Sequence, residues 1–258
     1  MTALRQYLAL SRRAIVNIAR TPAAIVPALV FPLMFLALTS AAMARTIDLP
    51  GFPPVESFVQ FAIATTILQG SLFGATAAGA DMAKDIEDGF FERLVASPVA
   101  RTSILVGRVA GAATLGFVQA WLFIGIATLF GTQIQGGVLA MVLISVVAAV
   151  AAAGIGSLSM AFGLRSGSAE AVQGSFPLIF VLLFFSSAFF PRDLMDGWFR
   201  SVATWNPLSR LIEALRHQVI FGVDFGEFLV ALGVATGILV VGVTIAGMAL
   251  RGRLARGS

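Results

Sequence analysis

Six long apolar stretches, none of which contains a charged residue, follow one another along the chain. A bilayer core about 30 Å thick is crossed by roughly 20 apolar helical residues, which is close to the length of each stretch. In hydrocarbon the backbone must satisfy its hydrogen bonds within the segment, which favours helices. We therefore predict an all-α integral membrane protein whose six transmembrane helices are Ala23–Ala44, Phe58–Ala80, Val109–Phe130, Gly137–Leu164, Ala171–Phe190 and Phe228–Leu250.

The residues before the first span, 1–22, mix apolar residues with arginines. In a helix, four apolar residues would lie near one face, away from the arginines: Leu4, Leu8, Ile15 and Ile18. This pattern predicts a helix that lies in the cytoplasmic interface of the membrane. The alternative is a solvated tail that only sets the topology. We expect the first span to be retained, because it is longer than the apolar region of a signal peptide.

A dense charged segment, residues 81–101, lies between the second and third spans. On a helix its acidic and apolar residues would form neighbouring stripes: Asp81, Asp85, Asp88 and Glu92 beside Met82, Ile86, Phe90 and Leu94. We predict a break at Gly89 and a helix end at Ser97–Pro98. A solvated loop needs no exposed apolar side chains. We therefore expect this segment to form a partner surface or to pack on the chain's own helices.

The segment between the last two spans, residues 191–226, is long for a loop. It contains Trp198 and Trp205, and tryptophan is enriched at membrane interfaces. Asn206–Pro207 is typical of a helix start, with asparagine as the cap and proline in the first turn. We predict one or two short amphipathic helices that dip into the outer leaflet or cover the pore mouth. Their polar face is expected to carry Arg210, Glu213, Arg216 and His217, with His217 paired to Glu213.

Basic residues set the orientation of a membrane protein, because its cytoplasmic loops are enriched in arginine and lysine. If the chain crosses six times, twelve basic residues lie on the side of the termini and five lie on the opposite side. We therefore predict a single transmembrane domain, residues 1–258, in the cell membrane with both termini cytoplasmic. The basic residues flank helices and do not form a separate domain, which argues against nucleic-acid binding.

The residues present also exclude several kinds of chemistry. The chain has no cysteine and a single histidine, so disulfides, thiol catalysis and Cys-ligated metals are excluded. A phosphate-binding P-loop requires Gly-Lys-Ser/Thr, whereas the only lysine, Lys84, stands between Ala83 and Asp85. The absence of charge within the spans argues against a proton-coupled or sodium-coupled carrier. We predict that the chain is not an enzyme and holds no cofactor of its own.

The order of these motifs resembles the ABC-2-type exporter permeases, and in particular it is similar to daunorubicin and multidrug efflux permeases. Between Asp85 and Arg108 the residues that agree with the family pattern are Glu87, Gly89, Glu92, Leu94, Ser97, Pro98, Arg101 and Gly107. Phe176–Pro191, Trp205–Leu208 and Glu213–Arg216 resemble the fifth span and the outer helices of the family. The resemblance covers the whole chain.

The resemblance implies a membrane subunit that pairs with a second copy of itself or with a paralogous permease. It also implies two separate ATPase subunits, which bind ATP and magnesium and dock on a cytoplasmic coupling helix. The residues expected at that contact are Asp85, Glu87, Asp88, Gly89, Phe90, Phe91, Glu92, Arg93, Leu94 and Pro98. The residues expected at the outer gate are Trp198, Trp205, Asn206, Pro207 and Glu213.

Three functions stay open at this point. The first is ATP-driven export of a hydrophobic drug-like molecule or lipid. The second is export of a lipid-linked glycan by the same kind of machinery. The third is an autonomous channel or secondary carrier, which the uncharged spans and the coupling segment oppose.

Overall fold

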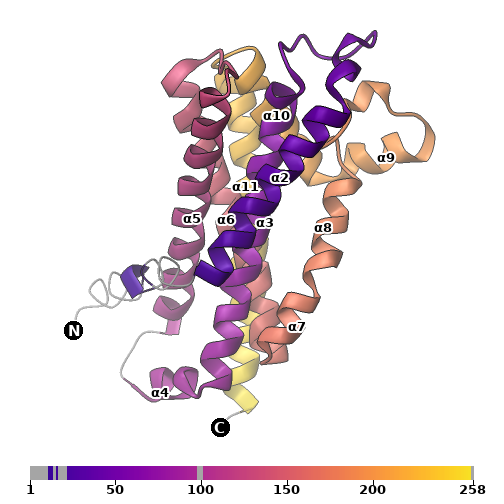
Figure 1. Cartoon of the computed structure of the whole chain (residues 1–258). Coiled ribbons are helices and arrows are strands. Elements are labelled where there is room, and N and C mark those ends of the chain that lie inside the picture. The colour runs from indigo at the N-terminus through magenta and orange to yellow at the C-terminus, as the bar shows by residue number, and fades with distance from the viewer. Residues whose placement is uncertain (1–10, 14–15, 17–21, 98–100, 257–258) are drawn as a thin grey trace.

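The computed structural model describes residues 11–13, 16, 22–97 and 101–256 (Figure 1). Within these ranges every regular element is a helix, so the predicted all-α fold is confirmed. Figure 1 shows an elongated bundle of long helices that run side by side. They are α2 (Pro22–Ala42), α3 (Phe58–Glu87), α5 (Arg101–Leu129), α6 (Gly137–Ser166) and α11 (Phe225–Arg256).

Four helices in the described part of the chain are long and apolar enough to cross a membrane. They are Phe58–Glu87, Thr102–Leu129, Gly137–Ser166 and Phe225–Ala255, which correspond to the second, third, fourth and sixth predicted spans. The first and fifth predicted spans coincide with shorter apolar helices, Val26–Ala42 and Ala169–Phe184. The helix lengths and composition therefore agree with a membrane protein.

The fifth predicted span, Ala171–Phe190, is not one continuous helix. It contains α7 (Ala169–Gly174) and α8 (Phe176–Phe184), which meet at Ser175. Pro177 lies in the first turn of α8, where its missing N–H group costs nothing, whereas inside a longer helix it would remove a hydrogen bond. After α8 the chain turns inward, and Ser187 is completely buried. The sequence pattern thus identified the apolar segment but missed its interruption.

Helices α3 and α6 form the centre of the bundle. Most of α3 is buried, whereas little of α11 is buried. Helix α6 packs against α3, α5 and α11. Where α3 and α6 cross, a Cβ atom at Gly163 would lie 2.5 Å from the carbonyl oxygen of Gly79. Glycine at both positions therefore allows the two backbones to approach closely.

The elements outside the long helices gather at the two ends of the bundle (Figure 1). We call one the α4 end, where α4 (Phe90–Ala96), α7 and the last turns of α11 lie. At the opposite α10 end lie η1 (Ala44–Asp48), η2 (Arg192–Leu194), α9 (Gly197–Trp205) and α10 (Pro207–Ile220). The predicted interfacial helix, residues 1–22, falls mostly outside the described residues, although 11–13 are helical.

Candidate functional site

The predicted coupling segment, residues 81–101, is divided between two helices at the α4 end. Its first seven residues continue α3, so this helix extends beyond the expected end of the second span at Ala80. Gly89 has a φ of +64°, which glycine adopts without strain, and it separates α3 from α4. The predicted break at Gly89 is confirmed, whereas Pro98 lies outside the described residues.

Asp85, in the last turn of α3, contacts two arginines. Arg108 of α5 forms an ion pair with Asp85, and it lies 3.6 Å from the carboxylate of Asp81. Nη2 of Arg13 lies 3.2 Å from Oδ1 of Asp85, and its guanidinium lies 4.0 Å from the ring centroid of Phe90. The Arg108 side chain is 12% exposed and that of Arg13 is 45% exposed. Asp85 thus joins α3 to α5 and to the N-terminal segment.

Glu87 connects α3 to α7. Its Oε1 atom accepts a hydrogen bond of 2.9 Å from the backbone N–H of Ala169, the first residue of α7. The hydroxyl of Ser168 accepts a second hydrogen bond from the N–H of Ala171. The first N–H groups of a helix have no intrahelical partner, and a carboxylate is favourable there because of the helix dipole. Glu87 therefore has a structural role within the chain.

Phe91 is buried, with 4% of its surface exposed. It belongs to a hydrophobic cluster that is separate from the main core and joins α4 to α3, α5, α6 and α11. This cluster, which we call the α4 cluster, consists of Met82, Ile86, Phe91, Ile104, Leu105, Met160, Ala161, Leu164, Ala246, Ala249 and Leu250. Leu94 packs against it and Phe90 is half-buried. The sequence left two alternatives for the apolar residues of this segment, a partner surface or packing on the chain's own helices. Phe91 packs on the chain's own helices.

Five charged residues in the described part of the segment are exposed: Lys84, Glu87, Asp88, Glu92 and Arg93. Lys84 and Glu87 lie in the last turn of α3, Asp88 follows that helix, and Glu92 and Arg93 lie on α4. Oε1 of Glu92 lies 3.8 Å from Nη2 of Arg253 on α11, and the Glu92 side chain remains 57% exposed. Asp88, Glu92 and Arg93 are the exposed charged groups on α4 and at its junction with α3.

A cavity of about 470 Å³ lies beside α4. It is lined by Phe91, Glu92, Val95, Ala96, Arg165, Arg253 and Leu254. Its wall therefore combines α4 with the last turn of α6 and the last turns of α11. Arg165, from the short turn between the fourth and fifth predicted spans, belongs to the same surroundings as the coupling segment.

At the α10 end the sequence analysis misplaced Arg216, which we expected on an exposed polar face. The side chain is buried, and it donates hydrogen bonds to the carbonyl oxygens of Phe61, Ser187 and Ala188 at 3.0 to 3.2 Å. Its guanidinium also lies 3.5 Å from the ring centroid of Phe61. Burial lowers the pKa of Arg216 to about 9, and the nearby Glu213 carboxylate opposes part of this shift. The guanidinium therefore remains protonated at neutral pH. Arg216 therefore fixes α10 to α3 and to the turn after α8.

The expected pair of His217 with Glu213 is replaced by another ion pair. Oε2 of Glu213 lies 3.0 Å from Nη2 of Arg192 in η2. The His217 ring instead packs against Phe221, with 4.8 Å between the ring centroids. These side chains, together with Pro53 and Pro191, line a cavity of about 210 Å³. Glu213 thus holds η2 against α10.

The predicted helix start at Asn206–Pro207 is confirmed. Oδ1 of Asn206 accepts a hydrogen bond of 2.9 Å from the N–H of Leu208, and Pro207 is the first residue of α10. The Asn206 amide also donates to the carbonyl oxygens of Leu182 and Phe185 on α8 and just after it. Both expected interface tryptophans are exposed, Trp198 by 69% and Trp205 by 88%. Asn206 therefore joins α10 to α8.

Beneath α9 and α10 lies an almost wholly apolar cavity of about 610 Å³. Helices α3, α6, α8 and α11 form its other walls, with the lining residues Leu72, Ile155, Leu158, Ile179, Leu182, Phe185, Ser201, Val202, Trp205, Asn206, Pro207, Leu208 and Ile238. Ser201 and Asn206 already form hydrogen bonds with backbone carbonyls. The cavity therefore suits hydrocarbon better than a polar molecule.

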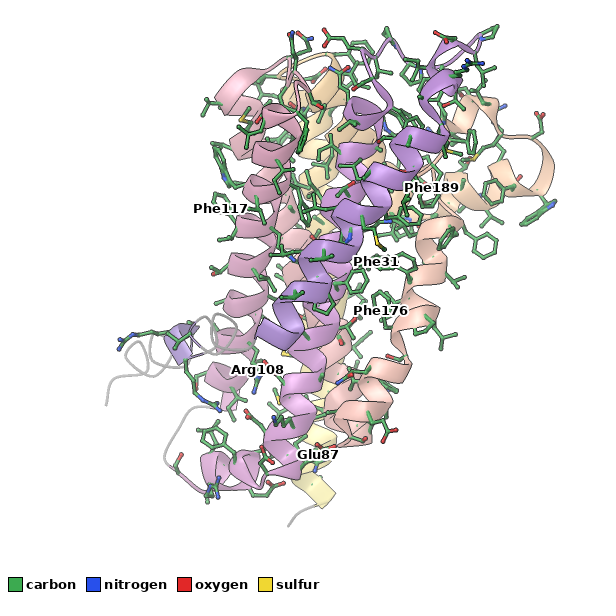
Figure 2. The ribbon with its side chains drawn as sticks, viewed as in Figure 1. Phe31, Glu87, Arg108, Phe117, Phe176 and Phe189 are labelled. Atoms are coloured by element: carbon green, nitrogen blue, oxygen red, sulfur yellow. The ribbon has the colours of Figure 1, made fainter. Side chains whose placement is uncertain are left out.

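A row of phenylalanines joins α2, α3 and α8 (Figure 2). The ring centroid of Phe31 lies 5.1 Å from that of Phe73 and 5.9 Å from that of Phe180. Phe73 lies 4.4 Å from Phe176, and further contacts extend the row through Phe184, Phe189 and Phe35. Edge-to-face and offset contacts at such distances are favourable for aromatic rings. The row forms a partly exposed aromatic surface along the bundle.

Gln69 precedes Phe73 by one helical turn on α3. It is 1% exposed, and neither polar atom of its amide has a hydrogen-bond partner among the described residues. A buried amide without a partner is unfavourable, and buried polar groups are normally hydrogen-bonded. The Gln69 amide therefore forms no hydrogen bond with the described residues, and it lies on the face of α3 that carries Phe73.

The described residues contain no cluster suited to a metal ion. Within ranges 11–13, 16, 22–97 and 101–256, no group of three or more His, Asp or Glu side chains is arranged to hold a metal ion. The residues that sequence reasoning missed are Arg216 and Arg253, both basic residues that contact helix ends or carbonyls. The sequence did contain an indication that Arg216 is buried. It follows Ile212 by four residues and therefore lies on an otherwise apolar face of the helix.

The sequence is similar to a family of known transport proteins. The ABC-2 type transporter family matches residues 5–220. A daunorubicin resistance ABC transporter permease protein of Streptomyces coeruleorubidus is 26% identical over 214 residues, 83% of this chain and 73% of the relative. A putative transport permease of Porphyra purpurea is 27% identical, with 83% of this chain and 74% of the relative covered.

A third relative extends the match further. A probable doxorubicin resistance ABC transporter permease protein of Mycobacterium tuberculosis is 22% identical over 236 residues, 92% of this chain and 84% of the relative. The family match spans α2 to α10, and it therefore includes the α4 segment, the phenylalanine row and the buried Arg216. The chain belongs to the ABC-2 type transporter family and is a transport permease.

Proposed function

We propose that this chain is the membrane-spanning subunit of an ATP-driven exporter, which moves a hydrophobic drug-like molecule or a lipid out across the cytoplasmic membrane. The chain crosses the membrane six times, with α2 and the α7–α8 pair as the first and fifth passes. Both termini and the α4 end face the cytoplasm, in agreement with the twelve-to-five distribution of basic residues.

The observation that carries this proposal is the position and surface of α4. Its apolar side, centred on Phe91, is anchored in the α4 cluster, while Asp88, Glu92 and Arg93 remain exposed beside it. A short helix that is fixed to the bundle on one side and charged on the other is suited to receive a force from a docked protein. We assign α4 as the coupling helix.

The partner at this helix is a separate ATPase subunit. The chain has no Gly-Lys-Ser/Thr sequence with which to bind the phosphates of ATP, so nucleotide and magnesium belong to that partner. A second copy of the chain, or a paralogous permease, completes the pathway between two membrane subunits. Membrane lipids surround the exposed apolar faces of α2, α8 and α11.

The phenylalanine row supports a hydrophobic substrate. Its partly exposed rings on α2, α3 and α8 offer aromatic contacts. Such a surface favours a largely apolar, aromatic molecule. The relatives named for daunorubicin and doxorubicin resistance support export of compounds of this kind.

The test combines ATPase binding with transport. The chain is purified with its ATPase, and a double charge reversal, Asp88→Lys with Glu92→Lys, is compared with the parent. Charge-assisted contacts are worth about 1.5–3 kcal/mol each, so we expect the affinity for the ATPase to fall at least tenfold. ATP-driven transport of a fluorescent anthracycline into inside-out vesicles should fall with it.

The matched control reverses two exposed acidic residues at the opposite end, Asp48→Lys with Asp193→Lys. This variant has the same change in net charge and should keep both ATPase binding and transport. The proposal fails if the α4 variant binds the ATPase like the parent. It also fails if the chain alone transports the compound on addition of ATP.

A further inference from the structure

We propose that Arg253, near the end of α11, is a positioning residue that transmits the movement of α4 to α6 and α11. This inference rests on the proposed function of α4 as the coupling helix, and it adds the route by which a force on that helix reaches the bundle. The route consists of one side chain on α11 that contacts two other helices, α6 and α4.

Arg253 contacts α6 and α4 at the same time. Its Nη1 atom donates a hydrogen bond of 3.2 Å to the carbonyl oxygen of Leu164, in the last turn of α6. Its Nη2 atom lies 3.8 Å from Oε1 of Glu92, and its guanidinium carbon lies 5.8 Å from the ring centroid of Phe91. The side chain is 27% exposed. Arginine suits this position because its planar group donates in several directions and also packs on an aromatic ring.

The contact with α6 is electrostatically favourable for a second reason. The last carbonyl groups of a helix have no intrahelical donor and carry the negative end of its dipole. The guanidinium of Arg253 lies at this end of α6. Arg253 therefore bridges the C-terminal end of α6 and the exposed carboxylate of α4.

The apolar residues beneath Arg253 connect the same three helices. The α4 cluster contains Phe91 of α4, Leu164 of α6 and Leu250 of α11, all of them buried. Leu254 follows Arg253 and packs against this cluster. Above the cluster, α11 packs along α6. A displacement of α4 must therefore either move α6 and α11 with it or break the contacts of Arg253 and Phe91.

The cavity beside α4 makes the side chain of Arg253 important for the contact between α4 and α11. About 470 Å³ of space lies between α4, Arg165 and the end of α11. At this space Arg253 of α11 reaches both Phe91 and Glu92 of α4. Loss of its side chain would enlarge the cavity and allow α4 to move independently of α11.

The first experiment measures this connection without reference to transport. The chain has no cysteine, so spin labels can be placed at Ala96→Cys on α4 and Ala255→Cys on α11, both at exposed positions. Pulsed electron paramagnetic resonance then gives the distribution of label distances. We expect a narrow distribution in the parent, a broader one in Arg253→Gln, and no change in the control Arg251→Gln. Arg251 is exposed on the same helix and carries the same charge.

The second experiment measures coupling in the complex with the ATPase. Mutations along a coupling route typically change the coupling free energy by 0.5–2 kcal/mol, so transport per ATP hydrolysed should fall about two- to thirtyfold in Arg253→Gln. Co-purification of the ATPase should remain as in the parent. Arg253→Lys keeps the charge but loses the fork of donors, and it should restore only part of the coupling.

The outcomes separate this inference from the proposed function. Broader label distances together with retained ATPase binding and reduced transport per ATP support it. An unchanged distance distribution in Arg253→Gln overturns it, as does a broader distribution with normal transport per ATP. Loss of ATPase binding also overturns it, because Arg253 would then act in docking. If the parent chain itself binds no ATPase, the proposed function fails, whereas the label distances still report on the contact between α4 and α11.

Discussion

Glu87 accepts a hydrogen bond from the backbone N–H of Ala169, 82 positions further along the chain. Through this contact the last turn of α3 holds the first turn of α7. Glu87 and Glu92 therefore differ in role, although both are exposed acidic residues of the same segment. Glu87 caps α7 within the chain, whereas Glu92 lies on α4 and faces Arg253 of α11.

Replacement of this cap tests the role of Glu87. We expect Glu87→Ala to destabilise α7 by about 0.5–2 kcal/mol, the range for loss of a capping side chain. Hydrogen–deuterium exchange of residues 169–174 should become faster, and ATPase binding should change little. The neighbouring Asp88→Ala serves as the control, because its exposed side chain caps no other helix. Equal exchange in the two variants would show that the contact does not stabilise α7.

The ion pairs of Asp85 are expected to be unequal. Arg108 is the less exposed partner and also donates to the backbone carbonyl of Asp81, so Arg108→Gln should lower stability by about 1–3 kcal/mol. Arg13 is nearly half exposed, and solvent screening should limit the effect of Arg13→Gln to within about 1 kcal/mol. Thermal unfolding in detergent measures both. A larger loss in the Arg13 variant would contradict this ranking.

Arg216→Met should destabilise the α10 end. The carbonyl of Ala188 keeps a hydrogen bond from Thr65, but that of Ser187 loses its side-chain donor. An unsatisfied buried group costs about 1–3 kcal/mol, and we expect a loss of this size in thermal unfolding. Arg210→Met on the exposed face of the same helix is the control and should have little effect. Equal stability of the two variants would mean that removal of a buried charge offsets the lost contacts.

The topology can be tested with cysteines, because the natural chain contains none. Gln135→Cys lies in the exposed turn between α5 and α6, and Ala96→Cys lies on α4. In intact cells a membrane-impermeant maleimide should label Gln135→Cys only, and Ala96→Cys should react after permeabilisation. Labelling of both positions from outside would refute the six-pass orientation.

The long helices were predictable because their signal is composition over some 20 residues, which tolerates local exceptions. The interruption at Ser175 was not, since Pro177 is compatible either with a kinked span or with a new helix start. The end of the second predicted span was placed too early for a similar reason. Charged residues after Ala80 were assigned to a separate segment, whereas the helix itself continues to Glu87.

The candidate site was predictable only in part. The pattern located the segment and its break at Gly89, because the backbone preference of glycine is a local property. It did not distinguish Phe91, which is buried, from Phe90, which is half-buried, because this depends on how α4 lies against α11. The contacts of Glu87 and Arg216 are equally long-range. Their side chains end near backbone groups that are distant in the sequence.

The contacts of Arg216 also constrain the order in which the molecule can be assembled. Its hydrogen bonds end on Phe61, at the beginning of α3, and on the turn that holds Ser187 and Ala188. These two segments are synthesised before α10, and α10 precedes α11. Helix α11 follows α10 in the chain and packs against it, so the surface that receives α11 is complete only once Arg216 has bonded to both earlier segments.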